Sequence, residues 1–305
     1  MSAPTAPAAG AAAGRAVWPG LALALSGSIC FSAKAIIVKL AYRHGVDAVT
    51  LIMYRMLFAL PMFVALSWWA GRGRPPLARR DALAVAGLGF SGYYLASFLD
   101  LAGLAYITAS LERLILYLNP TLVLALGFLL FRRRVTRRQL AALAVSYAGV
   151  GVVFGQEVSL AGAHVALGAA LVFGSAASYA VYLVYSGEEV RRLGALRLTG
   201  LATTVACLLC IVQFVALRPL SAARVAPEVI GLSLLNATLC TFARVVMVMM
   251  AIERIGATMT AQTGMIGPLS TVLLGVLVLR EPFTAWVAVG TALVLAGIWL
   301  LARAR

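Results

Sequence analysis

Long apolar runs, separated by short segments that hold most of the charge, dominate the pattern of residues along the chain. A helix that crosses a bilayer needs about 20 predominantly apolar residues, and these runs meet that length. They are too long and too uniformly apolar for barrel strands, so the spanning segments must be helices. The pattern predicts an all-α polytopic membrane protein with ten transmembrane helices, over residues 17–40, 48–70, 82–102, 104–131, 139–156, 164–186, 196–217, 229–251, 254–279 and 284–302.

The composition is that of a chain solvated by lipid over much of its surface. Hydrophobic residues make up 63% of the 305 residues and charged residues only 11%, whereas soluble domains have about 25% charged residues. The formal net charge of +15 could suit nucleic acid, but the basic residues form short clusters between apolar runs and no single basic face. We therefore expect the lipid bilayer as a partner and no nucleic acid.

The distribution of arginine between the two ends of the predicted helices sets the orientation. Fifteen arginines flank the spans on one side and four on the other, and the side rich in basic residues faces the cytoplasm. This predicts a multi-pass protein of the bacterial inner membrane with both termini cytoplasmic. Residues 1–16 are expected to form a disordered cytoplasmic tail, without a cleaved signal peptide.

An internal repeat appears when the sequence is shifted by 148 positions. Residues 107–149 then lie over residues 255–297 without a gap, so that Pro120 matches Pro268 and Gly149 matches Gly297. We expect two five-helix repeats, over residues 17–156 and 157–305. Because five is odd, the second repeat must enter the membrane from the opposite side. Inverted repeats are typical of alternating-access transporters, although simple structural duplication is the alternative interpretation.

The end of the ninth predicted helix and the tenth helix carry a recognisable motif. They read Arg280-Glu281-Pro282-Phe283-Thr284, then Gly290, then Leu293-Val294-Leu295-Ala296-Gly297. This resembles the drug/metabolite transporter superfamily, specifically its EamA-type ten-helix members. Arg133 stands in the first repeat where Glu281 stands in the second, so the motif is clear only once.

Within the superfamily, the chain is most similar to the aromatic amino-acid exporters of the YddG type. The resemblance implies a central cavity lined by helices one, three, four, six, eight and nine. It also implies export of amino acids, aromatic or otherwise apolar, or of related metabolites. A small-molecule substrate is thus the expected partner of a monomer. A multidrug or cation exporter of the same superfamily is the alternative.

Several ionisable residues lie inside predicted spans, where a charge costs at least about 2.5–3.5 kcal/mol. We expect Lys34 to bind a substrate carboxylate and Glu112 to bind an amine or a proton. The alternative is a structural ion-pair network that includes Arg55 and Arg113, for which a structural role is favoured. Arg244 lies near the centre of its span with no acidic residue nearby in the sequence, which favours an anion site or a gate.

Aromatic and small polar residues recur along the third and sixth predicted helices. Such stripes place rings and hydroxyl groups along one side of a helix. They suit a cavity for apolar or aromatic side chains, and they suit packing between helices almost as well. The candidate cavity residues are Phe90, Tyr93, Tyr94 and Ser97 in the third helix, and Ser175, Tyr179 and Tyr182 in the sixth.

The fourth and ninth predicted helices are interrupted at the same position of the repeat. Paired interruptions in corresponding helices point to the binding region of a transporter, because freed backbone carbonyls can bind substrate or water. A hinge without ligand contact is the alternative. The hinge or gating candidates are Pro120, Gly264, Gly267 and Pro268, and the amide candidates for substrate binding are Asn119, Asn236 and Gln262.

Enzyme and channel functions are disfavoured by the same sequence. Gly89-Phe90-Ser91-Gly92 matches the motif of intramembrane serine proteases, but the two histidines are predicted at helix ends, far from Ser91. The spacing Cys207-x-x-Cys210 lacks a second pair of metal ligands, and no nucleotide or covalent-cofactor motif is present. We expect no catalytic residue, metal or cofactor. A channel would need a ring of like charges or a repeated filter.

Overall fold

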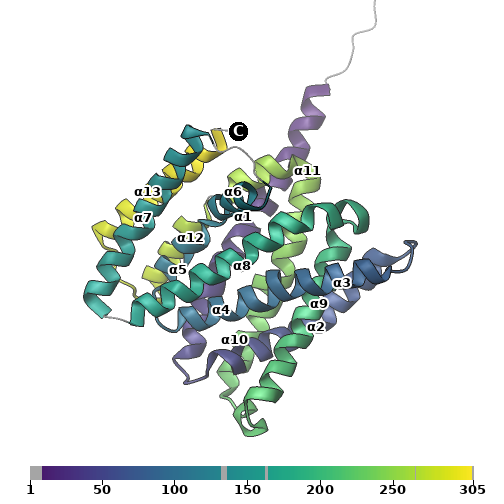
Figure 1. Ribbon diagram of the computed structural model, residues 1–305, viewed down its shortest axis with the longest axis horizontal. Helices are drawn as coiled ribbons and strands as arrows, with labels where there is room; N and C mark the ends of the chain where they lie inside the picture. Colours follow the sequence, from purple (N-terminus) through teal and green to yellow (C-terminus); the bar gives the residue numbers. More distant parts are fainter. Residues whose placement is uncertain (1–8, 132–135, 162–163, 265, 304–305) are drawn as a thin grey trace, which may run out of the picture.

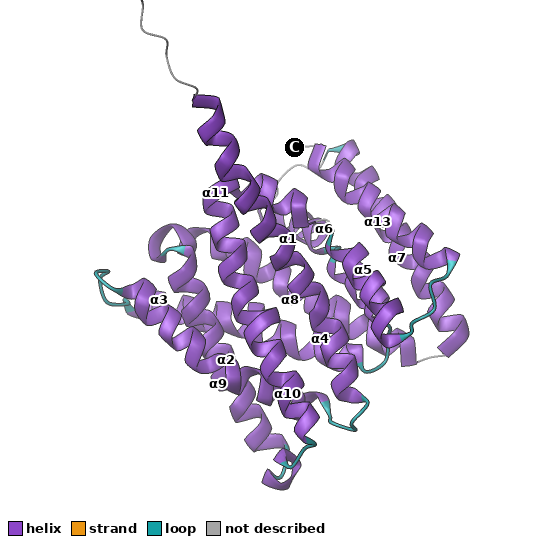
Figure 2. Cartoon of the chain, turned by 180° about the vertical axis from the view of Figure 1, so that it is seen from behind, coloured by secondary structure: helices purple, strands orange, loops and turns teal. Residues whose placement is uncertain are grey.

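Helices make up all the regular structure in the computed structural model, which describes residues 9–131, 136–161, 164–264 and 266–303 (Figures 1 and 2). Eight of these described helical segments are long and apolar enough to cross a membrane, and two shorter apolar segments, Gly267–Leu279 and Ala285–Leu301, follow them. The ten segments agree with the ten runs that the hydrophobic pattern predicts, so the fold is that of an all-α polytopic membrane protein.

The first five-helix repeat begins with α1 (Ala9–Tyr42) and α2 (Ala48–Gly71). Its third span is divided into α3 (Arg79–Leu88), η1 (Gly89–Leu95) and α4 (Ala96–Leu104), and its fourth into α5 (Ala109–Leu116) and α6 (Asn119–Phe131). Helix α7 (Arg137–Ala161) completes it.

The second repeat follows the same order. It begins with α8 (His164–Leu193) and α9 (Ala195–Leu217), and after the short helix η2 (Leu220–Ala223) its third span contains α10 (Pro227–Leu235), η3 (Asn236–Ala243) and the start of α11 (Arg244–Gly264). Gly256, with a positive φ of 77°, marks the kink where one span ends and the next begins within α11. The rest of the bundle is α12 (Gly267–Leu274), η4 (Gly275–Leu279) and α13 (Ala285–Arg303).

Helix α1 begins at Ala9, so residues 9–16 are helical, whereas residues 1–16 were expected to form a disordered tail. The predicted start of the fourth helix is also wrong. The apolar run suggested that the fourth helix begins at residue 104, but α4 ends there and α5 begins at Ala109. Thr108 is the reason, because its side chain accepts a hydrogen bond from the backbone nitrogen of Leu111 at 3.1 Å and so caps α5. Hydropathy alone does not separate two apolar helices joined by an apolar turn.

Helix packing follows a pseudo-two-fold exchange of the two repeats. The most extensive contacts join α7 to α13, α2 to α9, α1 to α11, and α4 to α8. Helices α7 and α13 occupy the same place in the two repeats, and so do α2 and α9, so each of these pairs joins equivalent helices. The contact of α1 with α11 in turn corresponds to the contact of α8 with α4, because each joins the first helix of one repeat to the third span of the other. Figures 1 and 2 show α7 and α13 side by side at one edge of the bundle. The duplication seen in the sequence is therefore also a duplication of packing.

Both repeats carry a π-helical segment at the same place in their third span. These segments are η1 and η3. Their backbone hydrogen bonds join residues five apart in the sequence, whereas those of an α-helix join residues four apart. Short π-helical segments inside α-helices are frequent at functional sites. Their recurrence directs attention to the part of the bundle that lies between the two third spans.

The start of α1 and the end of α13 lie at the same end of the bundle (Figure 1). We predict that this end faces the cytoplasm, because most arginines lie there. Green fluorescent protein fused before residue 1 or after residue 305 should fluoresce, and alkaline phosphatase at either place should be inactive. Phosphatase fused after Arg224, in a loop at the opposite end, should be active. An active phosphatase at either terminus would contradict this orientation.

Candidate functional site

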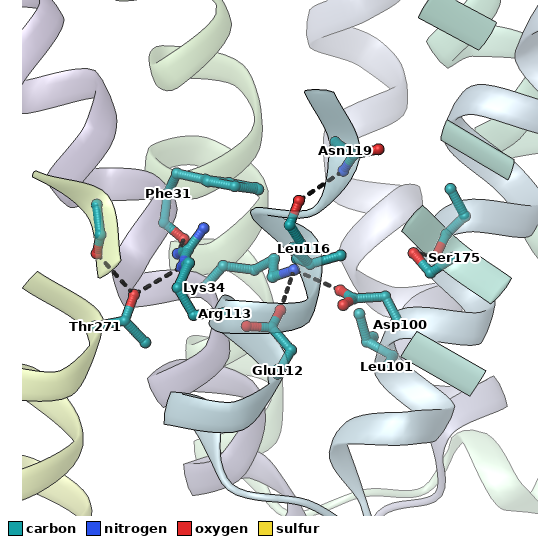
Figure 3. Close-up of polar contacts among 12 residues, drawn as sticks. Phe31, Lys34, Asp100, Leu101, Glu112, Arg113, Leu116, Asn119, Ser175 and Thr271 are labelled. Atoms are coloured by element: carbon teal, nitrogen blue, oxygen red, sulfur yellow. Dashed lines mark hydrogen bonds and ion pairs between the residues drawn. The ribbon is translucent and has the colours of Figure 1, made fainter. Parts of the chain in front are cut away.

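Three buried ionisable side chains from three helices meet inside the bundle. The Nζ atom of Lys34, on α1, lies 2.9 Å from Oε1 of Glu112 on α5 and also forms an ion pair with Asp100 on α4. Figure 3 shows the Lys34 side chain extended toward both carboxylates. We call these three residues the Lys34 cluster. It holds one positive and two negative formal charges away from water.

The structure brings Lys34 and Glu112 into direct contact and adds Asp100, which was not among the predicted site residues. The side chain of Asp100 is buried in the bundle. Its position in an otherwise apolar span was the available sequence signal. Isolated charges in such surroundings are costly, whereas an apposed set is tolerated.

The half-helix α5 positions Glu112 and is fixed by two carboxylates, one from α7 and one from the loop between η4 and α13. Glu281 accepts hydrogen bonds from the backbone nitrogen of Ala109 at 2.9 Å and from Oγ of Ser110 at 3.1 Å. Glu157 of α7 accepts hydrogen bonds from the backbone and side chain of Thr108. Negative charge at a helix N-terminus is stabilising. The Glu281 of the sequence motif thus has a structural role that the sequence did not reveal.

Arg113 and Arg55 fasten helices to one another. Nε of Arg113 donates to Oγ1 of Thr271 at 2.8 Å, and another guanidinium nitrogen donates to the carbonyl of Phe31 at 2.7 Å (Figure 3). Nε of Arg55 donates to Oγ1 of Thr241, in η3, at 3.0 Å. These contacts are those of structural residues.

Arg244 differs from the other buried cations. Its guanidinium carbon lies 3.7 Å from the centre of the Phe31 ring, and its side chain is only half-buried. Among the described residues, no carboxylate forms an ion pair with it. The same ring lies 4.3 Å from Cζ of Arg113 and 5.2 Å from Nζ of Lys34, so Phe31 is surrounded by three cations. Phe31 was not predicted from the sequence.

The predicted aromatic surface divides into two groups. The hydroxyl groups of Tyr93 and Tyr182 lie 3.2 Å apart, and the rings of Tyr179 and Tyr182 are stacked at 5.5 Å. We call these three residues the tyrosine cluster. Phe90 lies apart from them, because it is 47% exposed and contacts Tyr94 instead.

Hydrogen bonds to backbone carbonyls involve three serines of this region: Ser175, Ser178 and the protease-like Ser91. Oγ of Ser175 donates to the carbonyl of Ala96 at 2.7 Å, and Oγ of Ser178 donates to the carbonyl of Ser91 at 2.7 Å. The hydroxyl of Ser91 donates to the carbonyl of Gly87 in its own helix. Ser97 is half-buried on α4, three residues before Asp100.

The interruption of the ninth span is held by side chains from α1 and the fourth span. The hydroxyl of Tyr117 donates to the carbonyl of Gly264 at 2.6 Å, and Oγ of Ser32 donates to the carbonyl of Gly267 at 2.9 Å. A Cβ on Gly267 would lie 2.3 Å from the Tyr117 hydroxyl, so this contact requires glycine. Pro268 is buried beside it.

The amide candidates have different surroundings. Nδ2 of Asn119 donates to the carbonyl of Leu116 at 2.9 Å across the break in the fourth span, while Pro120 is exposed. Asn236, the first residue of η3, is buried, and its Oδ1 has no hydrogen-bond partner among the described residues. The side chain of Gln262 lies outside the described part of the structure.

Gly92 in η1 permits the close approach of the Tyr182 ring. A Cβ at this position would lie 2.4 Å from Cγ of Tyr182. Overpacking of this kind costs about 1–3 kcal/mol, so Gly92→Ala should lower the melting temperature in detergent by about 2–10 °C. Gly87→Ala is the matched control, because a Cβ there meets nothing within 4 Å. Equal melting temperatures of the two variants would contradict the packing seen here.

Comparison with known proteins gives a family match over most of the chain. Residues 18–155 and residues 166–303 each match the model of the EamA-like transporter family. The chain is 31% identical over 278 residues to the uncharacterized transporter YcbK of Bacillus subtilis (strain 168), with 86% of each protein covered. It is 22% identical over 250 residues to the uncharacterized transporter YetK of the same organism, covering 81% of this chain and 76% of that protein.

A solved crystal structure has a similar fold. It superposes with a TM-score of 0.64 at 17% sequence identity, and the match covers 94% of this chain and 99% of the other. At this level of identity the likeness concerns the fold alone. The two family matches coincide with the two repeats of the bundle.

Proposed function

Because the chain belongs to the EamA-like transporter family of the drug/metabolite transporter superfamily, we propose that it is a secondary transporter that exports amino acids. Aromatic or other apolar amino acids are the proposed substrates, and the bacterial inner membrane is the proposed location. Movement of one inverted repeat against the other would expose a central site to each side in turn.

The observation that carries this proposal is that no carboxylate of the described residues pairs with the guanidinium of Arg244. Even partial burial of a cation without a counter-ion is unfavourable, and arginine binds carboxylates through two parallel hydrogen bonds. Among the described residues, the surrounding layer holds the cations Lys34, Arg55, Arg113 and Arg244 and the carboxylates Asp100 and Glu112. A substrate carboxylate at Arg244 would supply negative charge where the protein lacks it.

The Lys34 cluster would take the substrate ammonium group. Lys34 was expected to bind the carboxylate, but its ammonium group already faces two carboxylates. Oε2 of the buried Glu112 has no hydrogen-bond partner among the described residues. The cluster carries an excess of one negative charge, which suits a cation. The guanidinium carbon of Arg244 and Nζ of Lys34 lie 3.7 Å and 5.2 Å from the centre of the Phe31 ring, so Arg244 and the Lys34 cluster would bind opposite ends of a zwitterion.

The tyrosine cluster would contact the substrate side chain. The three tyrosines pack against one another and offer ring faces and hydroxyl groups. Aromatic pairs contribute about 0.5–1.5 kcal/mol beyond the burial of their area. This arrangement favours amino acids with aromatic or apolar side chains over charged ones.

Counterflow in proteoliposomes with three related compounds tests the proposal. Phenylalanine has both charged groups, phenethylamine lacks the carboxylate, and 3-phenylpropionate lacks the amine. We expect saturable counterflow of phenylalanine, and at least about tenfold slower counterflow of both analogues, since loss of one charged contact costs about 1.5–3 kcal/mol.

Other outcomes would overturn the proposal. Preferred exchange of phenethylamine would identify an exporter of organic cations. Flux that rises linearly with substrate concentration, without counterflow, would identify a channel.

A further inference from the structure

A cavity of about 500 Å³ opens at the arginine-rich end of the bundle, away from the candidate substrate site. It lies where α2 leads into α3 and where α8 turns into α9. Three arginines and one carboxylate contribute charge to its lining, which consists of Arg74, Pro75, Pro76, Asp81, Arg192, Leu193 and Arg197. Two hairpins, one from each repeat, therefore build a single basic cavity.

Two of the three arginines are fixed by the backbone and are not neutralised. A terminal nitrogen of Arg74 donates to the carbonyl of Leu193, and one of Arg197 donates to the carbonyl of Pro75 at 3.0 Å. Arg192 pairs with Asp81 at 2.6 Å and with Glu189 at 3.6 Å. Among the described residues, no carboxylate pairs with Arg74 or Arg197, so the lining retains two uncompensated positive charges.

The local backbone holds these guanidinium groups at the cavity. Gly194 has a positive φ of 83°, and a Cβ there would lie 2.5 Å from a terminal nitrogen of Arg74. Arg197 packs over Gly71, where a Cβ would lie 3.5 Å from its Nε. Each guanidinium has five N–H donors, so most of them stay available after the carbonyl contact. The N–H donors of a guanidinium group held in a fixed orientation match the spacing of the oxygens of a phosphate group.

The position of the cavity along the helices places it at the depth of lipid headgroups. Trp68, near the end of α2, is 64% exposed, and its ring lies 3.8 Å from the guanidinium carbon of Arg72. Exposed tryptophans beside basic residues mark the membrane–water interface. Basic cavities between helices at this depth are suited to anionic lipid headgroups.

We propose that this cavity binds the phosphate headgroup of an anionic phospholipid and so ties the α2–α3 and α8–α9 hairpins together. The bound headgroup neutralises Arg74 and Arg197 and links one repeat to the other. The site is independent of the substrate, and its occupancy is independent of what the protein transports.

Thermal unfolding of the full chain in nanodiscs tests this site. We expect the wild-type melting temperature to be at least about 3–5 °C higher in phosphatidylglycerol than in phosphatidylcholine. The double variant Arg74→Gln/Arg197→Gln should lose that difference. Arg224→Gln, which removes an arginine at the opposite end, should keep it.

A second variant separates loss of lipid binding from a folding defect of the double arginine variant. Pro76→Glu adds a carboxylate to the lining and leaves both arginines and their carbonyl contacts in place, so it should also abolish the lipid-dependent difference. Addition of inorganic phosphate to phosphatidylcholine nanodiscs separates the sources of the anion. Lack of stabilisation by phosphate would support the lipid, whereas full stabilisation by phosphate would overturn the lipid assignment. A lipid-dependent difference that persists in both variants would also overturn it.

Discussion

Replacement of Arg244 by glutamine should reduce the apparent kcat/KM for phenylalanine counterflow by about a hundredfold. Arg244 has no carboxylate partner among the described residues, so its removal frees no buried negative charge. The variant should therefore fold, yet lose a charge-assisted contact worth about 1.5–3 kcal/mol with the substrate. Transport in proteoliposomes, normalised to folded protein from size-exclusion chromatography, measures the effect.

Two comparisons separate a binding role of Arg244 from a packing role. Arg244→Lys keeps the charge and should retain part of the activity, since lysine cannot form the bidentate contact. Arg224→Gln removes an exposed arginine from a loop and should transport normally. If Arg244→Gln lost folded yield and activity in equal measure, Arg244 would be a structural residue and the proposed carboxylate site would be wrong.

Replacement of Lys34 by methionine should cause the largest loss of folded protein among single changes in the membrane interior. It leaves the carboxylates of Asp100 and Glu112 buried together without their common cation. Removal of one partner from a buried charge pair costs about 3–5 kcal/mol. The triple variant Lys34→Met/Asp100→Asn/Glu112→Gln replaces all three charged side chains of the cluster by neutral ones. It leaves no unpaired charge there, so it should recover most of the folded yield. It should not recover transport.

The double variant Lys34→Met/Glu112→Gln gives the intermediate point of this cycle. It keeps one unpaired carboxylate at Asp100, so its yield should lie between those of the single and triple variants. Strictly additive losses across the set would show that the three residues do not share an environment. Recovery of both yield and flux in the triple variant would show that the Lys34 cluster is structural only.

Prediction of the site from the sequence was limited by helix rotation and by local helix type. Lys34, Glu112 and Arg244 were all recognised as buried charges, but the sequence did not show which of them pair. The burial of Asp100 depends on which side of α4 faces the bundle. Phe90 and Tyr93 were assigned to one surface, yet η1 is π-helical and carries Tyr93 to Tyr182 while Phe90 stays exposed.

Three further residues have roles that could not be predicted from the sequence, because these roles depend on contacts between distant parts of the chain: Phe31, Glu157 and Glu281. In the sequence, nothing distinguishes Phe31 from the other residues of its apolar run. In the structure, its ring contacts three cations from three helices. Glu157 and Glu281 lie far from Thr108 and Ala109 in the sequence, but both cap α5. No local pattern encodes a hydrogen bond from a backbone nitrogen to a carboxylate that lies 49 or 172 residues away.

The sequence by itself determined the number of membrane spans, their approximate limits and the repeat. Each of these depends on the transfer of a contiguous segment into lipid, a free energy that local composition sets. Only the tertiary structure decided that Lys34 pairs with two carboxylates whereas Arg244 has none among the described residues. The cost of a buried charge depends on the distance to its counter-ions, and those distances exist only once helices from both repeats have packed.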